Sequence, residues 1–303
     1  MVKISLSKDI ENWYLTEIES FFKRNKTYSY KQFDMLVKSS LGISFKELLF
    51  ASPDKLKTHA NKIKNDRPSN FMSDSNKLIA VYKKFRASVS SKKFIEKANL
   101  KVCPYCNRNY IFNFKKNKKN EATAQLDHFY DKSTYPYFAL SMYNLVPSCG
   151  ICNQRKSKKD VLVEPIFNPY QDNIHNHISF KSSEILSLEE LKEKSLDFFA
   201  EERIGISIET KTTDTKIKEH LETFNIEGLY NNHKDIIAEL YQTRIIYSDE
   251  YIEELLKEFG GIVFKDKEDL LRLITCGYVD DDSLNKRPLS KLIKDISKEL
   301  GLV

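Results

Sequence analysis

Residues 101–159 read KVCPYCNRNYIFNFKKNKKNEATAQLDHFYDKSTYPYFALSMYNLVPSCGICNQRKSKK, and this stretch decides the fold. It begins and ends near two cysteine pairs, CPYC at 103–106 and CGIC at 149–152. KVCPYCNRNYIFNF and EATAQLDHFY are predicted to form two strands joined by the loop KKNKKN. After a loop rich in Tyr and Pro, residues 151–159 are predicted to form a short helix. The sequence therefore predicts a strand–strand–helix module with the cysteine pairs placed around it.

The two cysteine pairs predict a structural metal site. Each pair has the spacing of a zinc knuckle, in which a tight turn aims both sulfurs at one ion. Together Cys103, Cys106, Cys149 and Cys152 supply the four ligands of a tetrahedral zinc site. Because four thiolates leave no open coordination position, this zinc is expected to clip the first strand to the start of the helix. The alternative is that one pair is redox-active or merely buried.

The remaining cysteine and the chain's hydropathy indicate a cytoplasmic protein. Cys276 stands alone and is expected to be a small buried hydrophobe rather than a ligand. The five cysteines do not resemble a secreted disulfide framework. No run approaches the roughly 18 apolar residues of a membrane span, and MVKISLSKDIENWYL at the N-terminus lacks a signal-peptide core. We therefore expect a cytoplasmic location without membrane association.

Charge is strongly segregated along the chain. The 303 residues carry a net charge of +6, with 41% hydrophobic and 30% charged residues, as in soluble globular proteins. Residues 1–159 hold 31 Lys and Arg against 13 Asp and Glu, whereas residues 160–303 hold 18 against 30. This asymmetry suggests that the first half contacts nucleic acid. The acidic half either contacts a basic partner or keeps the protein soluble.

The regions that flank the module are predicted to be mainly helical. Helices are expected near 8–25, in 29–50 with a break at Gly42, at 53–65, at 74–97, at 214–224 and over 229–258. Strand-like pieces occur at 177–181 and 203–209. The predicted fold class is thus α+β and mostly helical, with a basic helical region at 1–99, the module at 100–165 and an acidic, mainly helical region at 166–303.

Four polar residues stand between and beside the cysteine pairs. These are Asp127-His128, Asn144 in YNLVP, and Asn153 directly after Cys152. The run LDHFYDKSTYPYFALSMYNLVPSCGICNQRKSKKD resembles the signature of HNH (ββα-metal) endonucleases: Asp-His at the hairpin, Asn-Leu sixteen residues after the His, and CxxCN-x-x-K at the helix start. The last position is Asn rather than His, a common variant in this superfamily. The resemblance implies a zinc-stapled ββα fold and metal-dependent cleavage of nucleic acid.

The chemistry of phosphodiester hydrolysis agrees with this resemblance. It needs a deprotonated water and a cation on the developing charge. His128 is the expected general base, since its reference pKa lies near neutrality. Asp127 and Asn153 are the expected oxygen ligands for magnesium or manganese, with Asn153 aimed by its neighbour Cys152. Adjacent residues on a strand point opposite ways, so Asp127 and His128 can serve one centre only if the strand ends or bends there.

Further roles are expected around this centre. By resemblance, Asn144 holds the loop that orients His128. Lys156 lies three residues after Asn153, on the same helical face, and is expected to grip a phosphate, with Arg155 and Lys159 adding charge nearby. The lysines at 115, 116, 118 and 119 either solubilise the hairpin tip or contact DNA. Tyr130, Tyr135 and Tyr137 are expected to pack under the loop rather than stack on bases.

A wider resemblance concerns the second half of the chain. NPYQDNIHNHISF at 168–180 and IKEHLETFNIEGLYNNHKDIIAELYQTRIIYSDEYIEELL at 217–256 are similar to the HNH nuclease subunit of Septu-type anti-phage defence systems. That subunit acts with an ATPase partner. The resemblance implies a defence role, with the acidic region at 166–303 docking a protein partner.

Three functions follow from these observations. The first is a DNA endonuclease that leaves 5′-phosphate and 3′-hydroxyl ends, as the resemblance implies. The second is a ribonuclease that acts on structured RNA such as tRNA, because nothing in the motif reads the sugar. The third is a non-catalytic zinc module that binds nucleic acid or a partner. The third does not need Asp127, His128 and Asn153, so their joint presence argues against it.

Overall fold

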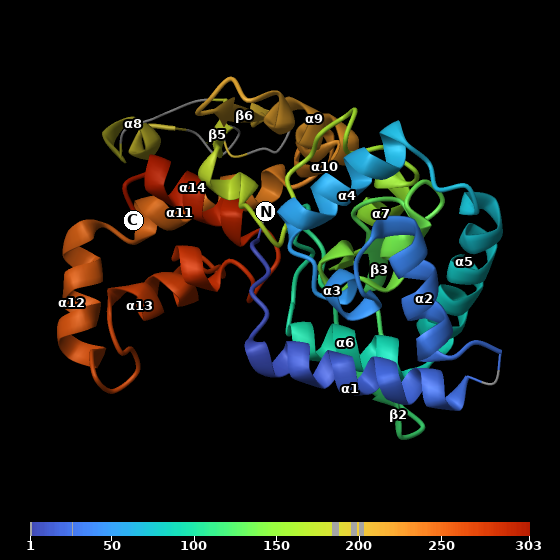
Figure 1. Cartoon of the computed structure of the whole chain (residues 1–303). Coiled ribbons are helices and arrows are strands. Elements are labelled where there is room, and N and C mark those ends of the chain that lie inside the picture. Colours follow the sequence, from blue (N-terminus) through green and yellow to red (C-terminus); the bar gives the residue numbers. More distant parts are fainter. Residues whose placement is uncertain (1, 26, 184–187, 195–198, 200–202) are drawn as a thin grey trace. The chain divides into compact units, whose positions relative to one another are not determined.

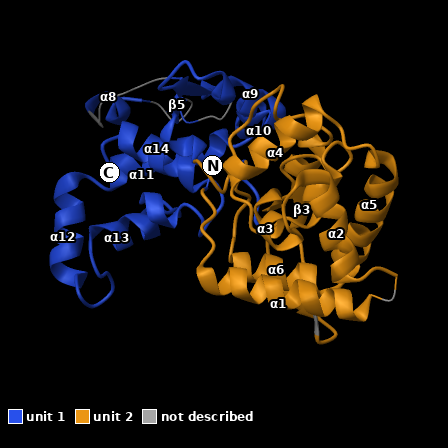
Figure 2. Ribbon diagram, in the orientation of Figure 1, with its two compact units in different colours: residues 1–2, 106–110, 173–303 blue, residues 3–105, 111–172 orange. Residues whose placement is uncertain are grey.

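The computed structural model describes every residue except 1, 26, 184–187, 195–198 and 200–202. It is a mostly helical α+β structure, as predicted, and its described strands form three two-stranded antiparallel sheets (Figure 1). The chain forms two compact units, which Figure 2 shows in different colours. We call residues 3–105 and 111–172 the N-terminal unit, and residues 1–2, 106–110 and 173–303 the C-terminal unit. The three-part division at 99 and 165 stays a prediction.

Six helices open the N-terminal unit: α1 (Lys8–Arg24), α2 (Tyr30–Leu41), α3 (Phe45–Leu49), α4 (Pro53–Asn65), α5 (Phe71–Ala87) and α6 (Val89–Ala98). Ser29 and Ser44 begin α2 and α3 with capping boxes, and Gly42 ends α2 in the left-handed conformation (φ 79°). The predicted break at Gly42 is confirmed. The single helix expected at 74–97 is wrong, because Ser88 is extended there and its hydroxyl caps α6.

Aromatic rings form the core of this unit and support the loop that carries the candidate site. Tyr14 packs against Phe85 and Phe94, with ring centroids 6.3 and 5.3 Å away. Its hydroxyl donates to the Leu140 carbonyl oxygen at 2.8 Å. Leu140 ends the 3-10 turn η1 (Pro136–Leu140), which packs on α5. The buried aromatic core therefore fixes the backbone of η1 through the Tyr14 hydroxyl and the packing on α5.

The central module differs in detail from the predicted strand pair. β1 (Asn113–Lys116) and β2 (Lys119–Ala122) form a tight hairpin, whose turn residues Asn117 and Lys118 both have positive φ. The strand predicted over the CPYC pair is wrong, since that pair lies in a turn. The loop KKNKKN is shorter than predicted because its ends belong to β1 and β2.

The strand that completes the module lies in what was predicted to be loop. β3 (Gln125–His128) pairs with β4 (Leu145–Ser148), and α7 (Gly150–Lys156) follows directly. β4 is buried at every position, so it has no alternation of polar and apolar residues, and its Pro147 reads as a breaker. Proline is tolerated here because β4 is an edge strand. The ββα module is therefore β3–β4–α7.

The C-terminal unit is built on β5 (Ile178–Ser182) and β6 (Ile206–Thr210), close to the predicted strands. The free edge of β5 is covered by α14 (Ser290–Glu299). Asp295 and Glu299 accept hydrogen bonds from the amides of Phe180 and Ser182 at 2.8 and 3.3 Å. Side-chain carboxylates thus replace the missing neighbouring strand.

Further helices complete this unit: α8 (Leu188–Lys192), α9 (Thr215–Phe224), α10 (Ile226–Tyr230), α11 (Lys234–Ile246), α12 (Asp249–Phe259) and α13 (Lys267–Ile274). The helical stretch predicted over 229–258 is divided among three helices. Cys276 follows α13 in the left-handed conformation (φ 51°) and is exposed, so its predicted burial is wrong. None of the described helices combines the length and the apolar character that crossing a membrane requires.

Residues 106–110 are anchored within the C-terminal unit by Asn107. This fully buried asparagine has φ 53°, a conformation that Asn tolerates better than most residues. Its Nδ2 donates to the Leu284 carbonyl oxygen at 2.8 Å, and its Oδ1 accepts from the Lys291 amide at 3.1 Å. These bonds fix the backbone immediately after Cys106.

Candidate functional site

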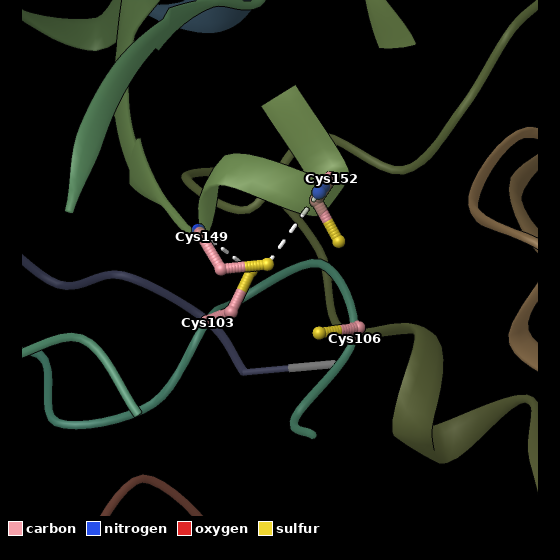
Figure 3. A group of neighbouring side chains, drawn as sticks. All are labelled: Cys103, Cys106, Cys149 and Cys152. Carbon is pink, nitrogen blue, oxygen red and sulfur yellow. Dashed lines mark hydrogen bonds between the residues drawn. The ribbon is translucent and has the colours of Figure 1, made fainter. Parts of the chain in front are cut away.

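The four paired cysteines form one buried cluster (Figure 3). Their Sγ atoms all lie within 4.8 Å of one another. A zinc–sulfur distance of about 2.3 Å places tetrahedral sulfurs about 3.8 Å apart, so the cluster fits such an ion. Cys103, Cys106, Cys149 and Cys152 can therefore hold a metal such as zinc. Among the described residues, no other group of three or more His, Cys, Asp and Glu ligand atoms gathers in this way.

The cluster also organises the start of α7. Cys149 is the N-cap of this helix, and its Sγ accepts from the Cys152 amide at 3.4 Å. The Cys149 amide in turn points to the Cys103 Sγ, also at 3.4 Å (Figure 3). Thiolates that accept amide hydrogen bonds are well suited to metal binding, because these bonds offset their negative charge. A metal held here would fix both the direction and the N-terminus of α7.

His128 is the last residue of β3 and is only 4% exposed. Its Nε2 lies 3.1 Å from the carbonyl oxygen of Ala139, and its ring packs edge-on against Tyr82 at a centroid distance of 4.2 Å. A carbonyl oxygen can only accept, so Nε2 carries the proton and Nδ1 carries the lone pair of the neutral ring. Burial, reinforced by the nearby Lys132, lowers the pKa of His128 to about 3, which keeps the ring neutral at pH 7.

Asn144 ties together the loop that presents Ala139. It is fully buried, its Nδ2 donates to the carbonyl oxygens of Tyr130 and Phe138 at 3.1 Å each, and its Oδ1 accepts from the Tyr130 amide at 2.7 Å. The amide side chain therefore joins the residues after β3 to η1. This is the position that the sequence resemblance expects for a loop-holding asparagine.

Asp127 points to a different set of neighbours from His128. It is 3% exposed, its Oδ2 accepts from the Tyr105 hydroxyl at 2.7 Å, and both its oxygens lie 3.3 Å from the Lys156 ammonium. Strand alternation sends Asp127 toward α7 and His128 toward Tyr82 and Ala139. The strand ends at His128.

One face of α7 lies along one face of β3. Asn153 and Lys156 are three residues apart on the helix, and Gln125 and Asp127 are two apart on the strand. The Asn153 Nδ2 donates to the Gln125 Oε1 at 2.6 Å, and Lys156 pairs with Asp127. The Asn153 amide nitrogen is thus hydrogen-bonded to Gln125. The amide oxygen of Asn153 takes no part in this bond, and it is the atom that a hard cation would use.

The three residues expected to bind phosphate differ in their burial and in their ion pairs. Lys156 is buried, and its ammonium also donates to the His128 carbonyl oxygen at 2.6 Å, so in this structure it neutralises Asp127 instead of facing solvent. The reason is that an aspartate buried beside it requires a compensating charge. Lys159 pairs with Glu164 at 2.8 Å. Arg155 is exposed.

The structure adds three residues that sequence reasoning missed. Tyr105 donates to Asp127, Tyr82 packs on His128, and the Lys132 ammonium lies 6.0 Å from the Tyr82 ring centroid. Lys132 is four residues after His128, and this proximity was the one available signal. Tyr82 and Tyr105 come from separate segments, and no local pattern connects them to the Asp-His pair.

Comparison with known proteins gives a partial match to a curated protein. No family profile and no solved structure matches the chain. The chain is 30% identical over 172 residues to the Septu protein PtuB of Bacillus thuringiensis. That match covers 52% of this chain and 64% of the relative, so the similarity spans less than two thirds of its length. The chain is thus similar to a Septu protein over about half of its residues.

Proposed function

We propose that this chain is a metal-dependent endonuclease of the HNH (ββα-metal) type, which hydrolyses phosphodiester bonds in DNA. The observation that carries the proposal is the tautomer of His128. Its Nε2 is bound to the Ala139 carbonyl oxygen, and its Nδ1 is left as a neutral base at the end of β3. A buried histidine that were only structural would not need Asp127 beside it, nor a loop built by Asn144 to orient it.

In the proposed reaction, His128 Nδ1 removes a proton from the attacking water. Asn144 acts through η1, because its Nδ2 donates to the carbonyl oxygen of Phe138, the residue before Ala139, whose own carbonyl oxygen contacts the imidazole. Asp127 and Asn153 would hold a magnesium or manganese ion, which supplies positive charge for the phosphorane and the leaving oxygen. The cysteine cluster would hold zinc and keep α7, and with it Asn153, in register with β3.

The residues present fit a hard divalent ion with few protein ligands. The Asp127 carboxylate has about four lone-pair directions, and Tyr105 and Lys156 leave some of this capacity available. Magnesium commonly keeps several waters and uses one or two protein ligands plus substrate phosphates. One carboxylate and one amide oxygen agree with that pattern.

Substrate and context are proposed on separate grounds. The excess of basic residues over 1–159 favours a polyanion, and the exposed Arg155 and the half-buried Lys132 lie on the module itself. Similarity to a Septu protein supports a role in anti-phage defence, in which this chain works with a protein partner such as an ATPase subunit. The acidic region at 166–303 is the proposed docking region for that partner.

One observation favours a competing function, a non-catalytic zinc module that binds nucleic acid or a partner. Asp127 and His128 are 3% and 4% exposed, and Lys156 already neutralises the carboxylate. Under the endonuclease proposal, substrate or partner must therefore open the region around η1 before a phosphate can reach His128. Under the competing proposal no such opening is required.

A substrate panel tests the endonuclease proposal. The full chain, with zinc bound, is incubated with duplex DNA, single-stranded DNA and total tRNA in Mg²⁺, Mn²⁺ or EDTA. The expected result is metal-dependent cleavage of duplex DNA, with 5′-phosphate ends, that Asp127→Asn and Asn153→Ala each abolish. Cleavage of tRNA alone would establish the ribonuclease instead. Binding without cleavage, unchanged by EDTA, would favour the zinc module.

A further inference from the structure

The side chain of Tyr105 links the first cysteine pair to Asp127. Tyr105 is the residue before Cys106 in the CPYC turn, and it is completely buried. Its hydroxyl donates to Asp127 Oδ2 at 2.7 Å, across a separation of 22 residues. A tyrosine hydroxyl keeps its proton at neutral pH, and a carboxylate can only accept, so Tyr105 is the donor of this bond.

The second cysteine pair reaches the same carboxylate. Lys156 lies four residues after Cys152, one turn further along α7, and its ammonium contacts both Asp127 oxygens at 3.3 Å. Each CxxC pair therefore delivers one donor to Asp127: a hydroxyl from within the first pair and an ammonium from the helix that the second pair begins. A carboxylate held from two sides has a fixed direction, because each donor prefers a lone-pair direction.

We propose that Tyr105 is a positioning residue that transmits the geometry of the cysteine cluster to Asp127 and thereby sets the affinity of Asp127 for the divalent ion. The inference rests on the proposed endonuclease function and concerns the same carboxylate. Tyr105 does not contact substrate. It acts because a metal on Cys103 and Cys106 fixes the turn in which it stands, and the turn fixes where its hydroxyl points.

Tyr105 is the better of the two donors to test. Removing the Lys156 ammonium would leave a buried carboxylate without its compensating charge, which destabilises the fold. Tyr105→Phe retains the buried ring and removes one hydroxyl. Tyr135→Phe is a matched control, since the buried Tyr135 also donates to an aspartate, Asp160, at 2.9 Å, away from the cysteine turns.

The experiment measures Mn²⁺ binding by calorimetry and the Mn²⁺ concentration for half-maximal DNA cleavage, each on the zinc-loaded chain of residues 1–303. Tyr105→Phe is expected to weaken Mn²⁺ binding and to raise the half-maximal concentration by about 10- to 100-fold, the usual effect of losing a partner of a metal ligand. Zinc content, measured by elemental analysis, is expected to stay at the wild-type level. Tyr135→Phe is expected to match the wild type in all three measurements.

Unchanged Mn²⁺ affinity in Tyr105→Phe, within twofold of the wild type, would overturn the positioning role whether or not the wild type cleaves DNA. Weaker Mn²⁺ binding together with lost zinc would also overturn it, because the effect would then come from collapse of the cluster. Asp127→Asn identifies the binding site in the wild type. If the wild type shows neither Asp127-dependent Mn²⁺ binding nor cleavage, the proposed function itself fails, and the inference falls with it.

Discussion

The imidazole Nε2 of His128 lies 3.1 Å from the carbonyl oxygen of Ala139, and this contact decides which ring nitrogen is free to accept a proton. The contact depends on the loop between β3 and β4, because Ala139 lies in η1. The orientation of the proposed base therefore depends on how the loop between β3 and β4 packs.

Asn144→Ala should destabilise the fold. It leaves the Tyr130 and Phe138 carbonyl oxygens and the Tyr130 amide without their partner in a buried loop. The expected loss is about 2–4 kcal/mol of unfolding free energy, measured by urea denaturation. Asn153→Ala is the control, since it removes one exposed hydrogen bond to Gln125 and should cost less than about 1 kcal/mol. Equal losses in the two variants would contradict the loop-holding role of Asn144.

Because His128 is buried as a neutral ring, the free energy of unfolding should decrease as the pH is lowered. The folded state lowers the His128 pKa from 6.5 to about 3, so its contribution is complete above pH 6.5 and is lost as the pH falls toward 3. From pH 7.5 to 5.5 the wild type should lose about 1.4 kcal/mol more than His128→Gln, which cannot titrate. Urea denaturation of zinc-loaded protein at both pH values measures this difference. Parallel losses in the two proteins would show that His128 is not buried as a neutral ring.

The cysteine cluster should bind one metal that supports the fold. Elemental analysis of purified protein is expected to give one zinc per chain. Cys149→Ser should lose the zinc and lower the melting temperature, because Cys149 is both a ligand and the N-cap of α7. Cys276→Ser, at an exposed position outside the cluster, should leave zinc content and melting temperature unchanged. Retention of zinc by Cys149→Ser would contradict the four-cysteine site.

The β1–β2 hairpin should contribute to nucleic-acid binding. Lys115, Lys116 and Lys118 are exposed, and the side chain of Phe114 on β1 is 47% exposed. Replacing the three lysines with Glu should weaken binding of duplex DNA about tenfold or more at moderate salt. It should also lower the salt dependence of binding. The triple variant Lys216→Glu, Lys218→Glu, Lys257→Glu, at exposed positions of the C-terminal unit, changes the net charge by the same amount and is the control. Unchanged affinity in the hairpin variant would mean that its lysines only solubilise the tip.

Local patterns predicted the cysteine cluster and several of the helices, but not the breaks within 74–97 and 229–258. Helix 53–65 begins at Pro53 after a capping serine, and the CxxC spacing alone pointed to four cysteines that the structure brings together. The predicted α+β fold is confirmed. These features depend on residues near each other in sequence or on a spacing that has few other meanings.

Features that depend on tertiary contacts were not predicted. β4 is a four-residue strand buried on both faces, and its proline reads as a breaker when its partner β3 is unknown. The Tyr105 and Lys156 contacts with Asp127 join segments 22 and 29 residues away. Lys156 was expected to face a phosphate, because helical spacing identifies a face of α7 but not what packs against that face.

Plasmid cleavage by wild type and His128→Ala is the most direct test of the central claim, that His128 is the base of a metal-dependent nuclease. Both proteins, and a His59→Ala control outside the site, are incubated with supercoiled DNA in EDTA, Mg²⁺ or Mn²⁺. The account predicts cleavage by wild type and His59→Ala in Mg²⁺ or Mn²⁺ alone, and its loss in folded, zinc-loaded His128→Ala. Cleavage by His128→Ala at the wild-type rate would contradict the account.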